Sequence, residues 1–160
     1  MNNTLYQFLP LLPEIFMLAM LSLILLIDAA VGDDKRYIAY GLSLATLAGT
    51  AYLTLRDFST MPALAMNGLF VDDPLSDVLK LFLYLTVAAV MVYSRNYLRQ
   101  RGLFKGEFFV LALFATLGMM VMVSANDLMA LYVGLELLSL SLYVVAAFNR
   151  DSERSAEAGL

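Results

Sequence analysis

Five long apolar stretches limit what this chain can fold into more than any other feature of its sequence. They cover Leu11–Val31, Tyr37–Leu55, Pro74–Tyr93, Glu107–Val123 and Leu128–Phe148. A transmembrane helix needs about 20 mainly apolar residues to cross the hydrocarbon core of a bilayer, and each stretch reaches or approaches that length. Barrel strands are shorter and alternate between apolar and polar faces, which these stretches do not. The sequence therefore predicts an all-α integral membrane protein with five transmembrane helices in contact with the lipid bilayer.

The composition supports this prediction and excludes several functions. Apolar residues make up 61% of the chain and charged residues 15%, whereas soluble proteins average about 45–50% and about 25%. The absence of Cys and His removes the ligands of iron–sulfur clusters, ordinary haem and most zinc sites. The net charge of −4 disfavours phosphate binding, which needs clustered Lys and Arg. We expect no metal site, no cofactor bound by this chain and no nucleic acid partner.

Local signals mark helix starts and one hairpin. Pro13 followed by Glu14, and Asp73 followed by Pro74, each suit the first turn of a helix. Asn67-Gly68 lies between two short apolar runs, Ala63–Met66 and Leu69–Val71, and this pattern indicates a hairpin. We therefore predict that residues 56–73 form a small ordered loop on one membrane surface.

The distribution of basic residues predicts the orientation in the membrane. If the five spans alternate, the loops 32–36 and 94–106 and the tail after Phe148 lie on one side. That side has eight Lys and Arg residues, and the opposite side has only Arg56. Cytoplasmic loops carry an excess of Lys and Arg. We expect the N-terminus outside and the C-terminal tail in the cytoplasm.

Most acidic residues fall in loops or near helix ends, where solvation accounts for them. Glu14 and Asp28 are predicted to lie within reach of the lipid headgroups at opposite ends of the first helix. Lys80 is different, because it lies roughly 9 Å into the third helix. Its amine can extend to the surface and form an anchor pair with Asp77, one turn earlier, or it can be a half-buried functional lysine. The sequence leaves these two interpretations open.

Glu136 is the strongest candidate for a functional residue. It falls about 12 Å into the fifth helix, close to the middle of the membrane, where a carboxylate costs about 2.5–3.5 kcal/mol to insert. Helical spacing places three hydroxyl side chains on the same face: Tyr132, Ser139 and Tyr143. An ionisable group at this depth usually belongs to an ion or proton pathway. The alternative is a neutral Glu136 that hydrogen-bonds a neighbouring helix and serves only in packing.

Several segments together resemble a known family. The stretch Ser124–Tyr143, which reads SANDLMALYVGLELLSLSLY, is similar to the fifth helix of the antiporter-like subunits of respiratory complex I, most closely the subunit N branch. Four shorter segments are similar to the same branch: Leu12–Ile15, Leu69–Leu75, Gly106–Phe109 and Ser155–Leu160. The resemblance covers the whole chain, and its ordered set of motifs is more specific than any one of them.

The resemblance implies a membrane subunit of proton-pumping NADH:quinone oxidoreductase with fourteen helices, of which this chain is an N-terminal fragment. Residues 1–106 would hold the first three helices and the outer loop. Residues 107–160 would hold the fourth and fifth helices and the start of the antiporter-like domain. Glu136 matches the family's fifth-helix glutamate, which pairs with a lysine on a later helix.

The resemblance also implies the partners and the location. The chain would contain no redox centre, while the whole complex uses NADH and quinone. Its partners would be other membrane subunits, and its location the bacterial inner (plasma) membrane. Two alternatives remain: a subunit of a multisubunit cation/proton antiporter or membrane-bound hydrogenase, and a membrane scaffold that transports nothing.

Overall fold

The computed structural model describes residues 8–31, 36–58 and 62–149 and contains five long helices within them. Their bounds are α2 Leu12–Val31, α3 Arg36–Arg56, α4 Pro74–Gln100, α5 Gly106–Ser124 and α6 Leu128–Ala146. All five are long and apolar enough to cross a membrane. The prediction of an all-α integral membrane protein with five transmembrane helices is confirmed.

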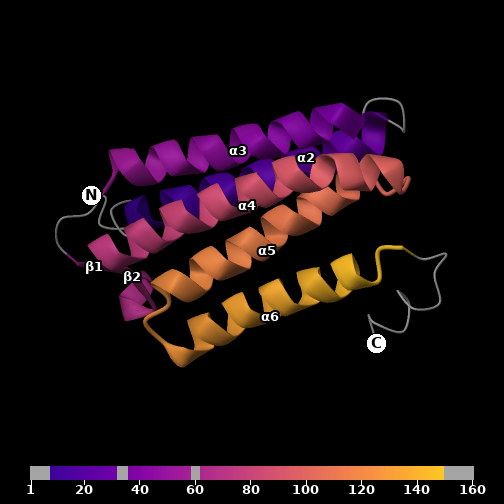
Figure 1. The fold of residues 1–160 in the computed structure, drawn as a ribbon. Coiled ribbons are helices and arrows are strands. Elements are labelled where there is room, and N and C mark those ends of the chain that lie inside the picture. Colours follow the sequence, from indigo (N-terminus) through magenta and orange to yellow (C-terminus); the bar gives the residue numbers. More distant parts are fainter. Residues whose placement is uncertain (1–7, 32–35, 59–61, 150–160) are drawn as a thin grey trace.

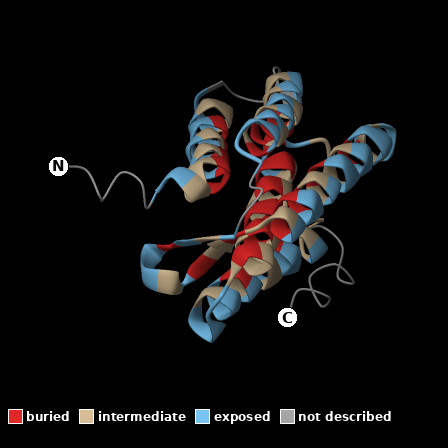
Figure 2. Ribbon diagram, turned by 90° about the vertical axis from the view of Figure 1, so that its left-hand side faces the viewer, coloured by how far each residue is buried: buried red, intermediate tan, exposed pale blue. Residues whose placement is uncertain are grey.

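The five helices run alternately up and down, and α5 lies between two unequal layers (Figure 1). Helices α2, α3 and α4 pack on one side of α5, and α6 packs on the other (Figure 1). Buried residues gather on the helix faces that turn toward one another, whereas α6 is exposed over most of its surface (Figure 2). The core of the described chain therefore lies among α2 to α5.

Helices α5 and α6 approach closely because a glycine from each faces the other. A Cβ atom on Gly118 would lie 2.8 Å from the backbone oxygen of Gly134, and one on Gly134 would lie 2.9 Å from the backbone oxygen of Gly118. Small residues allow membrane helices to pack through such backbone contacts. This contact holds α6 against the core.

The predicted hairpin between α3 and α4 is confirmed. Strands β1 (Ala63–Ala65) and β2 (Phe70–Asp72) pair in antiparallel register, and the turn contains Asn67 and Gly68 with φ of 58° and 89°. Asn and Gly tolerate this left-handed conformation better than other residues. The Asn126 side-chain amide donates to the Gly68 carbonyl at 2.8 Å. This hydrogen bond connects the hairpin to the turn between α5 and α6.

Helix α4 is longer than the apolar stretch that predicted it. It begins with a capping box of Asp73 and Ser76 and continues to Gln100, so Arg95 and Arg99 lie on the helix rather than in a loop. The hydropathy of a sequence indicates where the chain leaves the membrane, not where the helix ends. Helix α4 continues beyond its apolar stretch because the residues that follow also favour a helix in water. It ends near Gly102, whose φ is 69°. The predicted loop 94–106 is therefore wrong in its first half.

Candidate functional site

Lys80 is completely buried, with 0% of its surface exposed. Its Nζ lies 2.7 Å from Oε1 of Glu14 on α2, and Glu14 itself is only 6% exposed. The interpretation of Lys80 as a surface anchor is therefore wrong, and Glu14, which lies near the start of α2 as predicted, is buried against Lys80. The physical reason is that both side chains start near the hairpin end of the bundle, Glu14 on α2 and Lys80 on α4. They turn toward one another rather than toward the membrane surface.

The ion pair leaves much of the bonding capacity of both groups unused. Apart from their contact with each other at 2.7 Å, the carboxylate of Glu14 and the ammonium of Lys80 have no hydrogen-bond partner among the described residues. Buried charges are usually paired and hydrogen-bonded, because their desolvation is costly. The pair is thus an unusual site that calls for an explanation.

Two more carboxylates are buried around the pair. Asp77 lies one turn before Lys80 on α4 and is 4% exposed, and Asp72 at the end of β2 is 7% exposed. Asp72 and Lys80 both interact electrostatically with Glu14. The ring of Phe70 also lies close to the ammonium, with its centroid 5.4 Å from Nζ. We call Glu14, Asp72, Asp77 and Lys80 the Lys80 cluster.

A row of hydroxyl side chains on α3 leads to this cluster. The row is completely or almost completely buried and consists of Ser43, Thr46, Thr50 and Thr54. At its end, the Thr54 hydroxyl lies 3.3 Å from the hydroxyl of Tyr84, which interacts electrostatically with Glu14 and Asp77. Each hydroxyl of the row also donates to a backbone carbonyl of its own helix. Polar groups therefore continue from the cluster into the bundle.

Glu136 lies on α6 in a different environment. It is half-buried, and Tyr132, one turn earlier, hydrogen-bonds to it through its side chain. Tyr132 is 60% exposed, and Ser139 is half-buried. Glu136 forms no ion pair with a basic residue in the described part of the chain.

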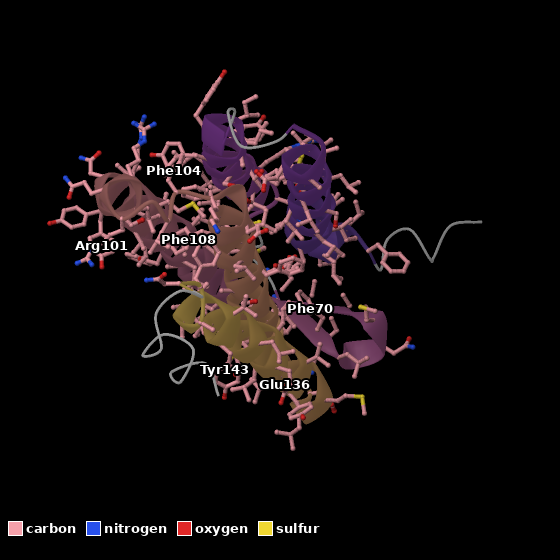
Figure 3. All side chains as sticks on the ribbon, turned by 90° about the vertical axis from the view of Figure 1, so that its right-hand side faces the viewer. Phe70, Arg101, Phe104, Phe108, Glu136 and Tyr143 are labelled. Atoms are coloured by element: carbon pink, nitrogen blue, oxygen red, sulfur yellow. The ribbon has the colours of Figure 1, made fainter. Side chains whose placement is uncertain are left out.

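Figure 3 shows where two of the predicted site residues lie. Glu136 and Tyr143 are on the same outer side of the molecule, away from Phe104 and Phe108. Tyr143, 58% exposed, lines a shallow cavity of about 250 Å³ together with Lys105 and Glu107 near the C-terminal end of α6. The structure thus brings Glu136 and Tyr132 together on α6, while Lys80 and Asp77 lie on α4.

Sequence reasoning missed Glu14, Asp72 and Tyr84. One available signal was depth, because Glu14 begins α2 and Lys80 follows the start of α4, and alternation places both starts on the same side of the membrane. Within the described residues, no group of His, Cys, Asp and Glu side chains could hold a metal ion. The Lys80 cluster consists of three buried carboxylates and one buried ammonium.

Comparison with known proteins gives a consistent result. The model of the family described as "NADH:quinone oxidoreductase/Mrp antiporter, TM" matches residues 125–160. Over all 160 residues the chain is 74% identical to the NADH-quinone oxidoreductase subunit N of Thiobacillus denitrificans and 55% identical to that of Nitrosomonas europaea. It is 50% identical over 154 residues, or 96% of its length, to that of Thioalkalivibrio sulfidiphilus. The chain covers 33%, 33% and 32% of these relatives, about a third of their length.

Proposed function

We propose that this chain is part of a membrane subunit of NADH:quinone oxidoreductase and takes part in proton translocation coupled to electron transfer from NADH to quinone. The observation that carries the proposal is the similarity of all 160 residues to relatives named as subunit N of that enzyme. The five apolar helices and the match of residues 125–160 to a proton-antiporter-type membrane family support it.

Glu136 is the proposed proton-pathway residue. Its carboxylate lies near the middle of α6, where an unpaired charge is costly, and it faces away from the core of the described chain. Its counter-ion would therefore come from outside the described residues, and a lysine suits that role. An anionic Glu136 would stabilise the charged form of this lysine, and moving the two apart would favour release of the proton. Tyr132 would keep the carboxylate oriented through its hydrogen bond.

The experiment that tests this role replaces Glu136 by Gln in the complete complex. Glu136→Gln keeps the size and hydrogen bonding of the side chain but removes its charge. At an effective dielectric of about 20, a pair about 4 Å apart loses about 4 kcal/mol of attraction before solvation offsets this loss. We expect the variant to assemble and to lose most proton pumping and quinone reduction. The matched control is Glu107→Gln, because Glu107 is exposed at the start of α5.

The remaining parts of the proposal concern cofactors, partners and location. This chain would bind no cofactor, and the whole complex would use NADH and quinone. The partners would be other membrane subunits, and the site of action the bacterial inner membrane. Residues 1–106 would form the first three helices and the outer loop, and residues 107–160 the start of the antiporter-like domain.

The proposed orientation places the hairpin outside the cell. Arg95, Arg99, Arg101 and Lys105 lie at the opposite end of the bundle from the hairpin and its neighbour Arg56 (Figure 1). The other basic residues of the predicted cytoplasmic side are Lys35, Arg36, Arg150 and Arg154, whose side chains lie outside the described part. Reporter fusions at residues 60–70 should report the outside, and fusions at 97–104 the cytoplasm. Reversed signals would overturn this orientation.

One observation favours a second candidate function. The matching family description also names the Mrp antiporter, so the chain could belong to a multisubunit cation/proton antiporter. Deletion of the gene separates the two. Loss of NADH:quinone reductase activity from the membranes supports the oxidoreductase, whereas retained reductase activity with sensitivity to sodium supports the antiporter.

A further inference from the structure

Four basic residues gather at the end of the bundle opposite the hairpin. Arg95 and Arg99 lie on the last two turns of α4, Arg101 follows directly, and Lys105 precedes α5. Figure 3 views the molecule from this end and shows Arg101 and Phe104 on the same side of it. In the described part of the chain, none of the four basic residues forms an ion pair with a carboxylate. Their positive charges are therefore available to a partner.

Two neighbouring aromatic rings hold Arg95 and Arg99 in place. The guanidinium carbon of Arg95 lies 5.2 Å from the ring centroid of Tyr40 on α3, and that of Arg99 lies 5.0 Å from the ring centroid of Phe104. The centroids of these two rings are 6.1 Å apart. Residues four apart on a helix are neighbours on one face, so the two guanidinium groups lie side by side. A guanidinium that rests on a ring keeps the N–H groups in its plane able to donate.

The arginine pair attracts an anion. Like charges four residues apart on a helix destabilise one another, and the buried Nε of Arg95 has no hydrogen-bond partner among the described residues. Two carboxylates share this end of the bundle. That of Asp28 lies where a Cβ on Gly106 would be, at the start of α5, and that of Glu107 is on an exposed residue of the same turn. The forked N–H groups of arginine match the oxygens of a phosphate, which could bind both arginines at once.

The depth of the pair indicates the source of the phosphate. The apolar stretch of α4 ends at Tyr93, so Arg95 and Arg99 lie roughly 3 Å and 9 Å beyond it along the helix. The headgroup layer on each side of a bilayer is about 5–8 Å thick. Tyr93 and Tyr37 are 91% and 59% exposed at this boundary, as aromatic residues of the membrane interface often are. The arginines are thus level with the phosphates of the lipids.

We propose that Arg95 and Arg99 bind the phosphate of an anionic phospholipid in the leaflet on the side opposite the hairpin. Tyr40 and Phe104 hold the two guanidinium groups, whose N–H groups donate to the phosphate oxygens. A zwitterionic headgroup also carries an ammonium, which two guanidinium groups repel, so the site selects a lipid with a net negative charge. Arg101 adds to the positive potential around the site. This lipid site does not depend on the role proposed for Glu136.

The test uses the complete complex in vesicles that contain a trace of photoreactive lipid. The reactive group lies next to the phosphate of either phosphatidylglycerol or phosphatidylcholine with the same acyl chains, and the labelled peptides are identified by mass spectrometry. We expect phosphatidylglycerol to label residues 93–105 several-fold more than phosphatidylcholine. In Arg95→Gln/Arg99→Gln this labelling should fall about tenfold or more, because each basic residue near the membrane surface strengthens the binding of anionic lipid about fivefold. The control is Arg56→Gln, which removes one exposed positive charge at the hairpin end.

Four outcomes overturn the lipid site. They are equal labelling of the wild type by the two lipids, unchanged labelling of Arg95→Gln/Arg99→Gln, and no labelling by either lipid, which would show that another subunit covers this surface. The fourth is loss of labelling in inorganic phosphate but not in chloride of the same ionic strength, which would assign the site to free phosphate.

Two further variants keep the test decisive. If Arg95→Gln/Arg99→Gln does not assemble, Arg95→Lys/Arg99→Lys keeps both charges but loses the forked donors, and it should be labelled less than the wild type. Labelling of this variant at the wild-type level overturns the phosphate geometry. Glu136→Gln should be labelled like the wild type, so a failure of the lipid site and a failure of the proposed function are distinguishable.

Discussion

The two charged sites of this membrane bundle differ in where their counter-charges come from. Lys80 is fully buried and reaches a carboxylate of the same chain at 2.7 Å. Glu136 is half-buried on the outer side of α6, and only the neutral Tyr132 is bonded to it in the described chain. The first site is assembled from α2, α4 and β2, whereas the second has a carboxylate without a counter-charge in the described part of the chain.

This difference shows how burial alone misleads in a membrane protein. The most deeply buried charge in the described chain is Lys80, but an ion pair at that position can also serve to hold helices together. Glu136 is less buried, but its counter-charge must be supplied from elsewhere, so its charge is available to interact with a moving or titrating partner. The two sites should therefore respond differently to substitution: at the first, stability and activity should fall together, whereas at the second, activity should fall while stability is kept.

The largest expected effect on stability is that of Lys80→Met. The substitution leaves Glu14 buried without its cation, and breaking a buried ion pair costs about 3–5 kcal/mol. We expect the subunit to unfold at a clearly lower denaturant concentration or to fail to assemble. The double variant Glu14→Leu/Lys80→Met should recover most of the loss, because an apolar pair avoids the unpaired charge. A double variant as unstable as the single one would show that the pair does not act as a unit.

The next largest effect concerns the contact that holds α6. A Cβ on Gly118 would lie 2.8 Å from both the Gly134 oxygen and the Leu138 nitrogen, which are backbone atoms that cannot easily move. Overpacking of this kind costs about 1–3 kcal/mol, so Gly118→Ala should lower the unfolding free energy by that amount. The control is Gly41→Ala on α3, where nothing lies within 4 Å of an added Cβ. Equal stabilities of the two variants would contradict the close packing of α5 and α6.

Local features of the sequence predicted most of the fold. The five helices follow from apolar length, and the hairpin follows from Asn67 and Gly68 between two short apolar runs. The far end of α4 was not predicted, because hydropathy reports the membrane boundary and not the end of a helix. Helix α4 ends at Gln100, two residues before Gly102, whose positive φ gives it a left-handed backbone conformation.

The surroundings of Glu136 were predicted better from the sequence than those of Lys80. The depth of Glu136 and its shared face with Tyr132 follow from helical spacing, and the structure places both together. The role of Glu136 stays a prediction. The partner of Lys80 was missed, because the choice between Asp77 on its own helix and Glu14 on another depends on how α2 and α4 pack. Helical periodicity cannot supply that information.

A smaller effect is expected at the start of α4, which sets the depth of Lys80. The Asp73 side chain accepts a hydrogen bond from the Ser76 backbone at 2.8 Å. Loss of such an N-cap costs about 0.5–2 kcal/mol, so Asp73→Ala should reduce the unfolding free energy by about 1 kcal/mol. Asp57→Ala is the control, because its contact with Arg56 is 4.0 Å long and exposed. A control as damaging as Asp73→Ala would show that the cap does not fix this helix start.

The smallest effect on stability is expected for substitution of Glu136, although the same substitution should cause a large loss of activity. Because Glu136 is bonded only to Tyr132 within the described chain, Glu136→Gln should change the unfolding free energy by no more than about 0.5 kcal/mol. This separates it from Lys80→Met, for which lost stability and lost activity are expected together.

The most direct test of the account is the proton-to-electron ratio of the complete complex carrying Asp, Gln or Ala at position 136. Each variant should assemble, and Glu136→Asp, which keeps the charge on a shorter stem, should pump more than Glu136→Gln or Glu136→Ala. The account predicts that pumping follows the charge and not the volume of the side chain. A Glu136→Gln complex that pumps at the wild-type ratio would contradict it and identify Glu136 as a packing residue.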